Sequence, residues 1–266
     1  MKMLKPFCAG ILTISVIGLT PFAANADTRP SDIALGNEVA VSEAPADWVD
    51  GLNPEFDPSE HVGETLLAGT SFETAKVIGQ VGVAEVSDKP QMGTFSVPLD
   101  PTDWAVCDVG GDANRVLGTI YTWPFTNAGE NLWWGGDVDL LCGTPSTSGW
   151  KHIRDRHQYD SPGHPNSYED VRGVFYKLTG NLPSAPWDFY MWEAVTATLD
   201  QPEHPIMVNK SEQKTCFHAP YRIFTGNGQV VAWWTNNVIL SRNNFTIITA
   251  FFSDNTGQHD CYRWNG

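Results

Sequence analysis

The hydrophobic and polar pattern predicts two helices at the start of the second half of the chain. Trp150–His157 contains no helix breaker, and small polar residues at 146–149 suit a helix N-terminus. Residues 167–178 repeat apolar side chains at helical spacing. The pattern of residues 188–199 fits either a helix or a strand.

The remainder of this half has the short β-branched and aromatic runs of an antiparallel sheet. Pro220–Thr225 and Gln229–Thr235 flank a Gly-Asn-Gly turn, which predicts a hairpin. Paired asparagines bracket the short run Val238–Ser241, and a last strand is expected over Phe245–Phe252. Helices followed by an antiparallel sheet indicate an α+β fold.

The first half has a weaker pattern. Residues 27–60 carry four prolines among many acidic residues, which is typical of a loop or a loose arm. From about Gly63, strand-like runs broken by Gly, Pro and Asp indicate a β-rich module; they are Lys76–Glu85, Thr94–Val97, Val116–Tyr121 and Val138–Cys142. We therefore expect an acidic β-rich region of unknown role over 27–145 and a second domain over 146–266.

Residues 1–26 have the parts of a secretory signal peptide. A short positive segment precedes an apolar run, Phe7–Leu19, and Ala24 and Ala26 supply the small residues of a cleavage site. No later stretch approaches the ~20 apolar residues of a membrane span. We expect a secreted or periplasmic protein that begins at Asp27 and has no membrane span.

Four cysteines remain after this cleavage: Cys107, Cys142, Cys216 and Cys261. An even number in an exported chain favours two disulfide bonds. Three pairings exist, and we favour Cys107–Cys142 with Cys216–Cys261 because each bond then stays within one half of the chain. The chain has neither close cysteine pairs nor a His-Glu-x-x-His motif, so we expect no metal site and no cofactor.

Charge is distributed unevenly between the halves. Residues 27–148 contain 20 acidic and 4 basic residues, whereas residues 149–266 contain 11 acidic and 10 basic residues. Every histidine except His61 also lies in the second part. The acidic part aids solubility, or alternatively it shields or mimics an anionic ligand of the second part.

Candidate chemistry is concentrated in the first predicted helix, where two imidazoles and three cations occupy seven residues: Lys151, His152, Arg154, Arg156 and His157. Cleaving RNA without a metal requires a base for the 2′-OH, an acid for the 5′-oxygen and cations for the phosphorane. Histidine with nearby Arg or Lys supplies all three near neutral pH. The alternative is a solvated helix whose cations pair with nearby acids. His152 and His157 lie about 140° apart around an ideal helix, so we do not expect them to converge on one point.

Gly149-Trp-Lys-His-Ile153 followed by Arg156-His157 resembles the Gly-aromatic-x-His-Ile-x-x-Arg-His motif of bacterial toxin nucleases, the group of barnase, EndoU, colicins and RelE. Tyr221–Phe224 with Gln229–Val231 resembles their central hairpin, and Thr246–Phe251 resembles their terminal strand. The resemblance covers 149–266. It implies helices packed on a four- or five-stranded antiparallel sheet and a metal-independent ribonuclease.

The resemblance also implies the site residues. The catalytic ones are His152, His157, Arg156 and Thr249, and the substrate-binding ones are Lys151, Arg154 and Arg222. Thr249 has a simpler explanation as well, because threonine is common in strands. The partners would be an RNA substrate and, where one exists, an immunity protein. Most such toxins are basic, and the nearly neutral charge of 149–266 predicts weak or local RNA binding.

Eleven tryptophans support an alternative function. Trp133 and Trp134 lie near Asp137 and Asp139, and such rings and carboxylates would suit a secreted carbohydrate-binding protein or a glycosidase. Tryptophan also simply fills protein cores. The nuclease requires His152 and His157 to share a cleft with Arg222 and Thr249. The sugar-binding alternative requires an exposed row of Trp beside carboxylates, away from the first helix.

Overall fold

A computed structural model describes residues 52–53, 55–57, 65–73, 75–76, 106–109, 111–127, 130–160, 166–180, 182–183, 185–253 and 261. Its strands are β1 Leu66–Gly69, β2 Val116–Thr122, β3 Phe125–Asn127, β4 Glu130–Trp133, β5 Gly136–Leu141, β6 Glu203–Asn209, β7 Lys214–Thr225, β8 Val230–Ser241 and β9 Ile247–Ser253. Its longer helices are α3 Trp150–His157, α4 Tyr168–Thr179 and α5 Trp187–Asp200. The predicted signal peptide and the strand expected over 94–97 lie outside the described residues.

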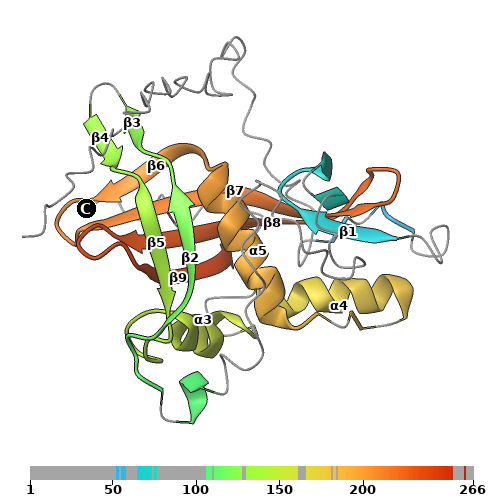
Figure 1. Ribbon diagram of the computed structural model, residues 1–266. Coiled ribbons are helices and arrows are strands. Elements are labelled where there is room, and N and C mark those ends of the chain that lie inside the picture. Colours follow the sequence, from blue (N-terminus) through green and yellow to red (C-terminus); the bar gives the residue numbers. More distant parts are fainter. Residues whose placement is uncertain are drawn as a thin grey trace, which may run out of the picture. The chain divides into compact units, whose positions relative to one another are not determined.

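Five strands form one antiparallel sheet, in which β1, β7, β8 and β9 follow one another in that order. The fifth strand, β6, pairs with the first part of β7, on the same edge where β1 pairs with its last part. Helix α5 contacts β7 and β8 on one side and β2 on another, and α4 packs against α5 (Figure 1). The fold is therefore α+β, with helices packed on an antiparallel sheet, as the order of the predicted elements indicates.

Side chains of the sheet alternate between two faces. On the face toward α5, which we call the helix face, Phe217, Tyr221 and Ile223 of β7 join the main hydrophobic core. The opposite face carries Cys216, Ile239 and Phe251, which pack with Cys261 in a second, smaller cluster. We call this second surface the disulfide face.

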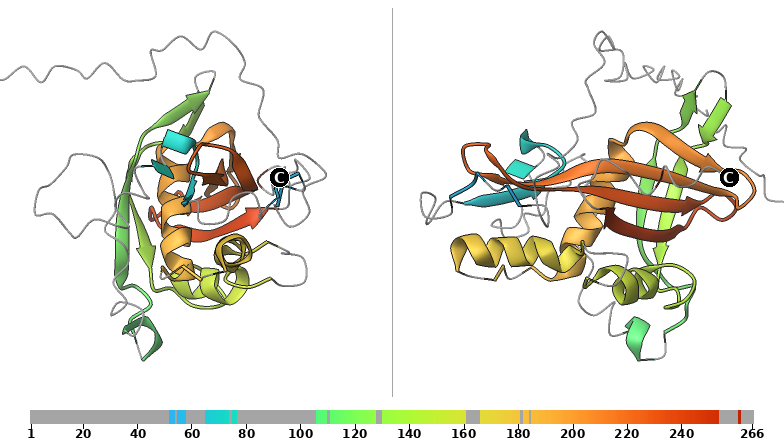
Figure 2. Two further views of the ribbon diagram at one scale, coloured as in Figure 1. Left: turned by 90° about the vertical axis from the view of Figure 1, so that its right-hand side faces the viewer. Right: turned by 180° about the vertical axis from the view of Figure 1, so that it is seen from behind.

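The strands β2 to β5 cover one end of the helix face (Figure 2). Trp133 is completely buried there, with its ring 5.9 Å from that of Phe217 and 5.2 Å from that of Phe245. Its indole N–H donates to Thr122 Oγ1 at 2.8 Å, so the buried nitrogen is satisfied. Described strands from the acidic first half thus share one core with the sheet of the second half.

The helix predictions are confirmed, and the ambiguous segment is a helix. The first predicted helix matches α3 at both ends, and the second ends at Gly180, which adopts the left-handed conformation that glycine favours. Residues 188–199 lie within α5, where Met191, Ala194 and Val195 are all fully buried. A helix covered on several sides shows no clear amphipathic period, which explains the ambiguity.

Two strand predictions were wrong in their extent. We expected Asn236 and Asn237 to interrupt the hairpin, but β8 runs through both to Ser241. The side-chain amide of Asn236 is buried without a large energetic cost, because it accepts a hydrogen bond from the Tyr168 hydroxyl at 2.7 Å and donates one to Thr198 Oγ1 at 2.9 Å. A polar residue with both groups satisfied does not break a strand.

The first half also departs from expectation where it is described. Lys76, the expected start of a strand, lies in a short helical turn, and residues 77–85 are outside the described residues. Leu52 forms a β-bridge with Ala232, and Phe56 is 8 % exposed in the core. The end of the expected loose arm is therefore packed against the sheet.

The structure contains the disulfide bonds Cys107–Cys142 and Cys216–Cys261, which confirms the favoured pairing. Stable disulfides are characteristic of oxidising compartments, so the pair fits an exported protein. None of the helices in the described part of the chain has the length and apolar character needed to cross a membrane.

We expect Tyr168→Phe to lower the free energy of unfolding by about 1–3 kcal/mol, because it leaves the buried Asn236 oxygen without its donor. Urea unfolding of both proteins measures the difference. Tyr176→Phe is the matched control, since Tyr176 lies on the same helix and is 54 % exposed. Equal losses in the two variants would contradict the role given to this hydrogen bond.

Candidate functional site

The position of α3 depends on Gly149. Its φ of 81° favours glycine, and a Cβ here would lie 2.5 Å from the carbonyl oxygen of Leu141. The Gly149 amide donates to the Ile248 carbonyl at 3.0 Å, and the Lys151 amide donates to the Cys142 carbonyl at 3.0 Å. Gly149, rather than one of the small polar residues before it, is the N-cap. These contacts fix the start of α3 between β5 and the edge strand β9.

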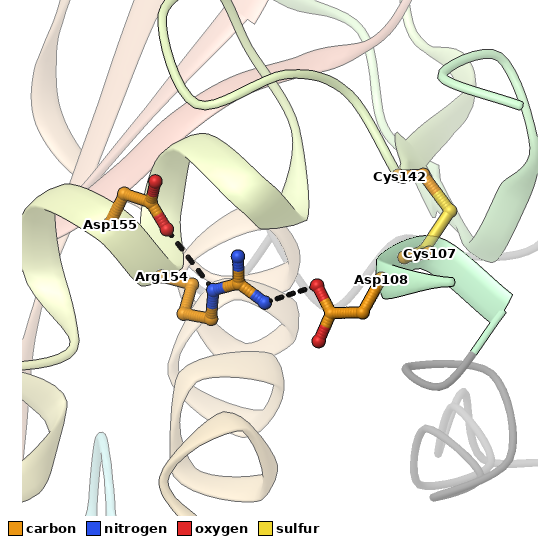
Figure 3. Close-up of polar contacts among 5 residues, drawn as sticks. All are labelled: Cys107, Asp108, Cys142, Arg154 and Asp155. Carbon is orange, nitrogen blue, oxygen red and sulfur yellow. Dashed lines mark hydrogen bonds and ion pairs between the residues drawn. A yellow bond between two sulfur atoms is a disulfide. The ribbon is translucent and has the colours of Figure 1, made fainter. Parts of the chain in front are cut away.

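Arg154 attaches α3 to a second segment (Figure 3). Its guanidinium donates to Asp108 at 2.5 Å and to Asp155 at 3.1 Å, and lies 4.7 Å from the centre of the Trp150 ring. Asp108 follows Cys107, which is bonded to Cys142. Nε and Nη1 of Arg154 thus both donate to carboxylates, and the bond to Asp108 holds α3 against the segment that contains Cys107.

The imidazoles of His152 and His157 lie close together, with ring centroids 6.1 Å apart. They approach more nearly than their angular separation on an ideal helix predicts. His157 is 4 % exposed and stacks on Phe251, with ring centroids 5.1 Å apart. His152 is half-buried, and its Nδ1 lies 3.0 Å from the carbonyl oxygen of Pro145.

Thr249 lies on the disulfide face, on the same side of β9 as Phe251. Its neighbour across the sheet is Ile239, and its side chain is 7 % exposed. Among the described residues, nothing hydrogen-bonds its buried Oγ1. The disulfide face thus brings Thr249 beside the ring on which His157 stacks.

Arg222 does not join this group, so the expectation that it shares a cleft with His152, His157 and Thr249 was wrong. It lies on β7 four positions beyond His218, which corresponds to ~13 Å along a strand. Its guanidinium lies 3.9 Å from the centre of the Trp233 ring and donates to the Thr70 carbonyl at 2.9 Å. Burial lowers the pKa of Arg222, and the carboxylate of Glu203 opposes that change.

His218 is a further histidine of this surface. It is fully buried and pairs across the sheet with Asn237, which in turn pairs with Phe251. Glu203 pairs with His218 on the other side, and burial raises the pKa of Glu203 while Arg222 opposes it. Its place on the disulfide face follows from strand alternation, because residues 216 and 218 of a strand share a face.

The remaining predicted cations are more accessible. Arg156 is exposed on α3, and Lys151 is half-buried at its start without an ion pair to any described residue. Within the described ranges, no three His, Cys, Asp or Glu side chains are grouped so that they could hold a metal ion. A cleft of about 220 Å³ lies against α4 and contains none of the predicted site residues.

Comparison with protein-family models, curated proteins and solved structures finds no match to this chain.

We expect Thr249→Val to leave the free energy of unfolding unchanged or to raise it by about 1 kcal/mol, since it removes a buried hydroxyl that no described residue satisfies. Thr215→Val is the matched control. The Thr215 hydroxyl donates to the Leu132 carbonyl at 3.2 Å, and its loss should cost about 1 kcal/mol. Urea unfolding distinguishes the two variants, and a larger loss at Thr249 would refute its assignment as unsatisfied.

Asp188 makes stability depend on pH beneath α3, where Trp187 stacks on Trp150. Burial raises the pKa of Asp188 to about 7. The backbone amides of Asp188 and Phe189 and the indole of Trp150 act in the opposite direction, because they favour the ionised carboxylate. The folded state therefore retains a proton that the unfolded state releases near pH 4, and this contribution to stability falls between about pH 4 and pH 7.

We expect Asp188→Asn to gain stability relative to the unmodified protein as the pH rises across that interval, by about 1–4 kcal/mol in total. Urea unfolding at pH 4.5 to 8 provides the measurement. Asp200→Asn, at the exposed end of the same helix, is the control, and its stability should follow pH in parallel with that of the unmodified protein. If the profile of Asp188→Asn also ran parallel to that of the unmodified protein, Asp188 would not titrate in this range.

Proposed function

We propose that the protein is an exported toxin that cleaves RNA without a metal ion and uses α3 as its catalytic helix. The observation that carries this proposal is the pair of imidazoles of His152 and His157, 6.1 Å apart. A motif that resembles the toxin nucleases surrounds both residues. Two neighbouring imidazoles suit a reaction that needs one base and one acid near neutral pH.

His152 is the proposed base. A carbonyl oxygen can only accept a hydrogen bond, so the contact with Pro145 places the proton of the neutral ring on Nδ1. The lone pair then belongs to Nε2, for which the described residues supply no hydrogen-bond partner. Nε2 is therefore available to take the proton of a ribose 2′-OH.

His157 is the proposed second imidazole. When the 2′-oxygen attacks the phosphorus, the bond to the 5′-oxygen breaks and a 2′,3′-cyclic phosphate forms. The departing 5′-oxygen takes a proton from the protonated imidazole of the pair, so His152 gains a proton and His157 loses one. Stacking on Phe251 fixes the orientation of the ring that donates.

Lys151 and Arg156 are the proposed phosphate ligands. Both lie on α3 with the two histidines. Arg154 is assigned no contact with the scissile phosphate, because Asp108 and Asp155 accept hydrogen bonds from its guanidinium. Arg222 lies further along β7 and is assigned no contact with the scissile phosphate. Thr249 is the proposed donor to that phosphate, because its hydroxyl has no described partner and lies beside Phe251.

Compartment and composition are consistent with this proposal. The two disulfide bonds fit a protein that acts after export. Only two cations are assigned to phosphate, which agrees with weak, local binding of RNA and a shallow dependence on salt. An immunity protein for the producing cell belongs to the same proposal.

We expect oxidised protein, residues 27–266, to cleave transfer RNA in EDTA and to leave 2′,3′-cyclic phosphate ends. His152→Ala should lower the rate by about 10²–10⁴-fold, because the general base is lost. His157→Phe should lower it similarly while keeping a ring against Phe251. Gel analysis of end-labelled RNA measures both rates.

Lys151→Ala tests the phosphate contact, and Lys210→Ala is its matched control because Lys210 is 72 % exposed and paired with Glu130. Lys151→Ala should slow cleavage, and Lys210→Ala should leave the rate unchanged. Folded protein that cleaves neither transfer RNA nor total RNA, or cleavage that both histidine substitutions leave intact, would refute the proposed function.

A further inference from the structure

A carboxyl group is enclosed where the start of α5 meets the start of α3. Asp188 lies in the first turn of α5 and is completely buried. The Trp150 indole and the backbone amides of Asp188 and Phe189 favour its ionised form. Apart from these groups, no described residue donates a hydrogen bond to either carboxyl oxygen. A carboxyl in such a place lowers stability when it is ionised, because burial disfavours the charge.

The Trp150 side chain links this carboxyl to α3. Trp150 is the first residue of the helix and is buried. Its ring stacks on that of Trp187, with centroids 6.1 Å apart, and the Arg154 guanidinium lies 4.7 Å from its centre. Since Trp187 and Asp188 are adjacent in α5, the Trp150 ring contacts the first turn of α5 and the body of α3 at once.

The position of Trp150 bears on the two imidazoles of α3. His157 follows Trp150 by seven positions, so both side chains lie on the same side of the helix, and both are buried. The helix has only eight residues and therefore little length over which to absorb a displacement at its start. A shift of the Trp150 ring is expected to move His152 and His157 relative to Phe251.

The groups that act on the charge of Asp188 come from three helices. Burial raises its pKa to about 7, and the carboxylate of Glu169 on α4 acts in the same direction, although Arg172 pairs with Glu169 at 2.8 Å. Helix α5 supplies backbone amides, and α3 supplies the Trp150 indole with the Arg154 cation against its ring. The carboxyl therefore changes its charge near neutral pH.

The two charge states of Asp188 hold the indole differently. A hydrogen bond from an N–H group to an ionised carboxylate is shorter and roughly twice as strong as one between neutral groups. The ionised form therefore fixes the Trp150 ring more firmly than the protonated form does.

We propose that Asp188 is a positioning residue of α3: its ionised carboxylate holds the Trp150 indole and so places the two imidazoles, and protonation releases this hold. The consequence for catalysis rests on the proposed ribonuclease function, and it is cleavage that becomes faster as Asp188 ionises. The same ionisation lowers the stability of the fold. A group that improves activity at the expense of stability is a recurrent feature of functional sites.

Fluorine NMR of the oxidised protein labelled with 5-fluorotryptophan tests this coupling without a substrate. Trp150→Phe identifies the Trp150 resonance, which should change position with a midpoint at about pH 7. Asp188→Asn should abolish this change, and the matched control Asp200→Asn should keep it. His152→Ala and His157→Phe should keep it as well, which distinguishes Asp188 from the imidazoles of α3.

Cleavage of transfer RNA gives a second readout. Asp188→Asn should lower kcat about tenfold at pH 8, where Asp188 is ionised, and leave KM unchanged. At pH 5.5 the variant and the unmodified protein should cleave at about equal rates, because Asp188 is then protonated. Urea unfolding at pH 8 should find the variant at least as stable, so slower cleavage would not reflect unfolding.

A Trp150 resonance whose dependence on pH survives in Asp188→Asn would overturn the proposal, whether or not the protein cleaves RNA. A ratio of cleavage rates that is the same at pH 5.5 and pH 8 would overturn it too. Folded protein that cleaves no RNA, but whose Trp150 resonance follows Asp188, would refute the ribonuclease and retain the coupling of Asp188 to α3. The two failures are therefore distinguishable.

Discussion

The pairing of β7 with β8 decides which side of the sheet each side chain occupies. Both strands have 12 residues, and a shift of one position would exchange the helix face with the disulfide face. The present register sends Phe217 and Tyr221 into the core and leaves Cys216 able to bond Cys261. The neighbouring strand β9 inherits this register, which places Thr249 and Phe251 beside α3.

The local sequence pattern was sufficient for elements whose start, end and turn depend on neighbouring residues. Helix α3 and the turn between β7 and β8 were predictable because helix breakers, turn residues and hydrophobic periodicity lie within a few positions of each other. Asn236 was misjudged because its partners, Tyr168 and Thr198, lie 68 and 38 positions away. The candidate site was predictable only in part for a similar reason. Arg154 was expected to bind substrate, but it donates a hydrogen bond to Asp108, which lies 46 positions earlier in the chain.

Two parts of the chain with different charge share one core. The cations and imidazoles of α3 come from the nearly neutral part of the chain, and the strands β2 to β5 come from the acidic part. Trp133 connects the two parts, since its indole N–H donates to Thr122 in the first half while its ring packs on Phe217 and Phe245 of the second half.

Cys107 and Asp108 are adjacent, and they hold the region of α3 by two bonds of different chemistry. The disulfide from Cys107 persists outside the cell and is reduced in the cytosol. The ion pair from Asp108 to Arg154 is indifferent to redox potential, although it is weaker and sensitive to salt. Reduction of the disulfide would therefore weaken the attachment of α3 to this segment, while the ion pair would keep the two in contact.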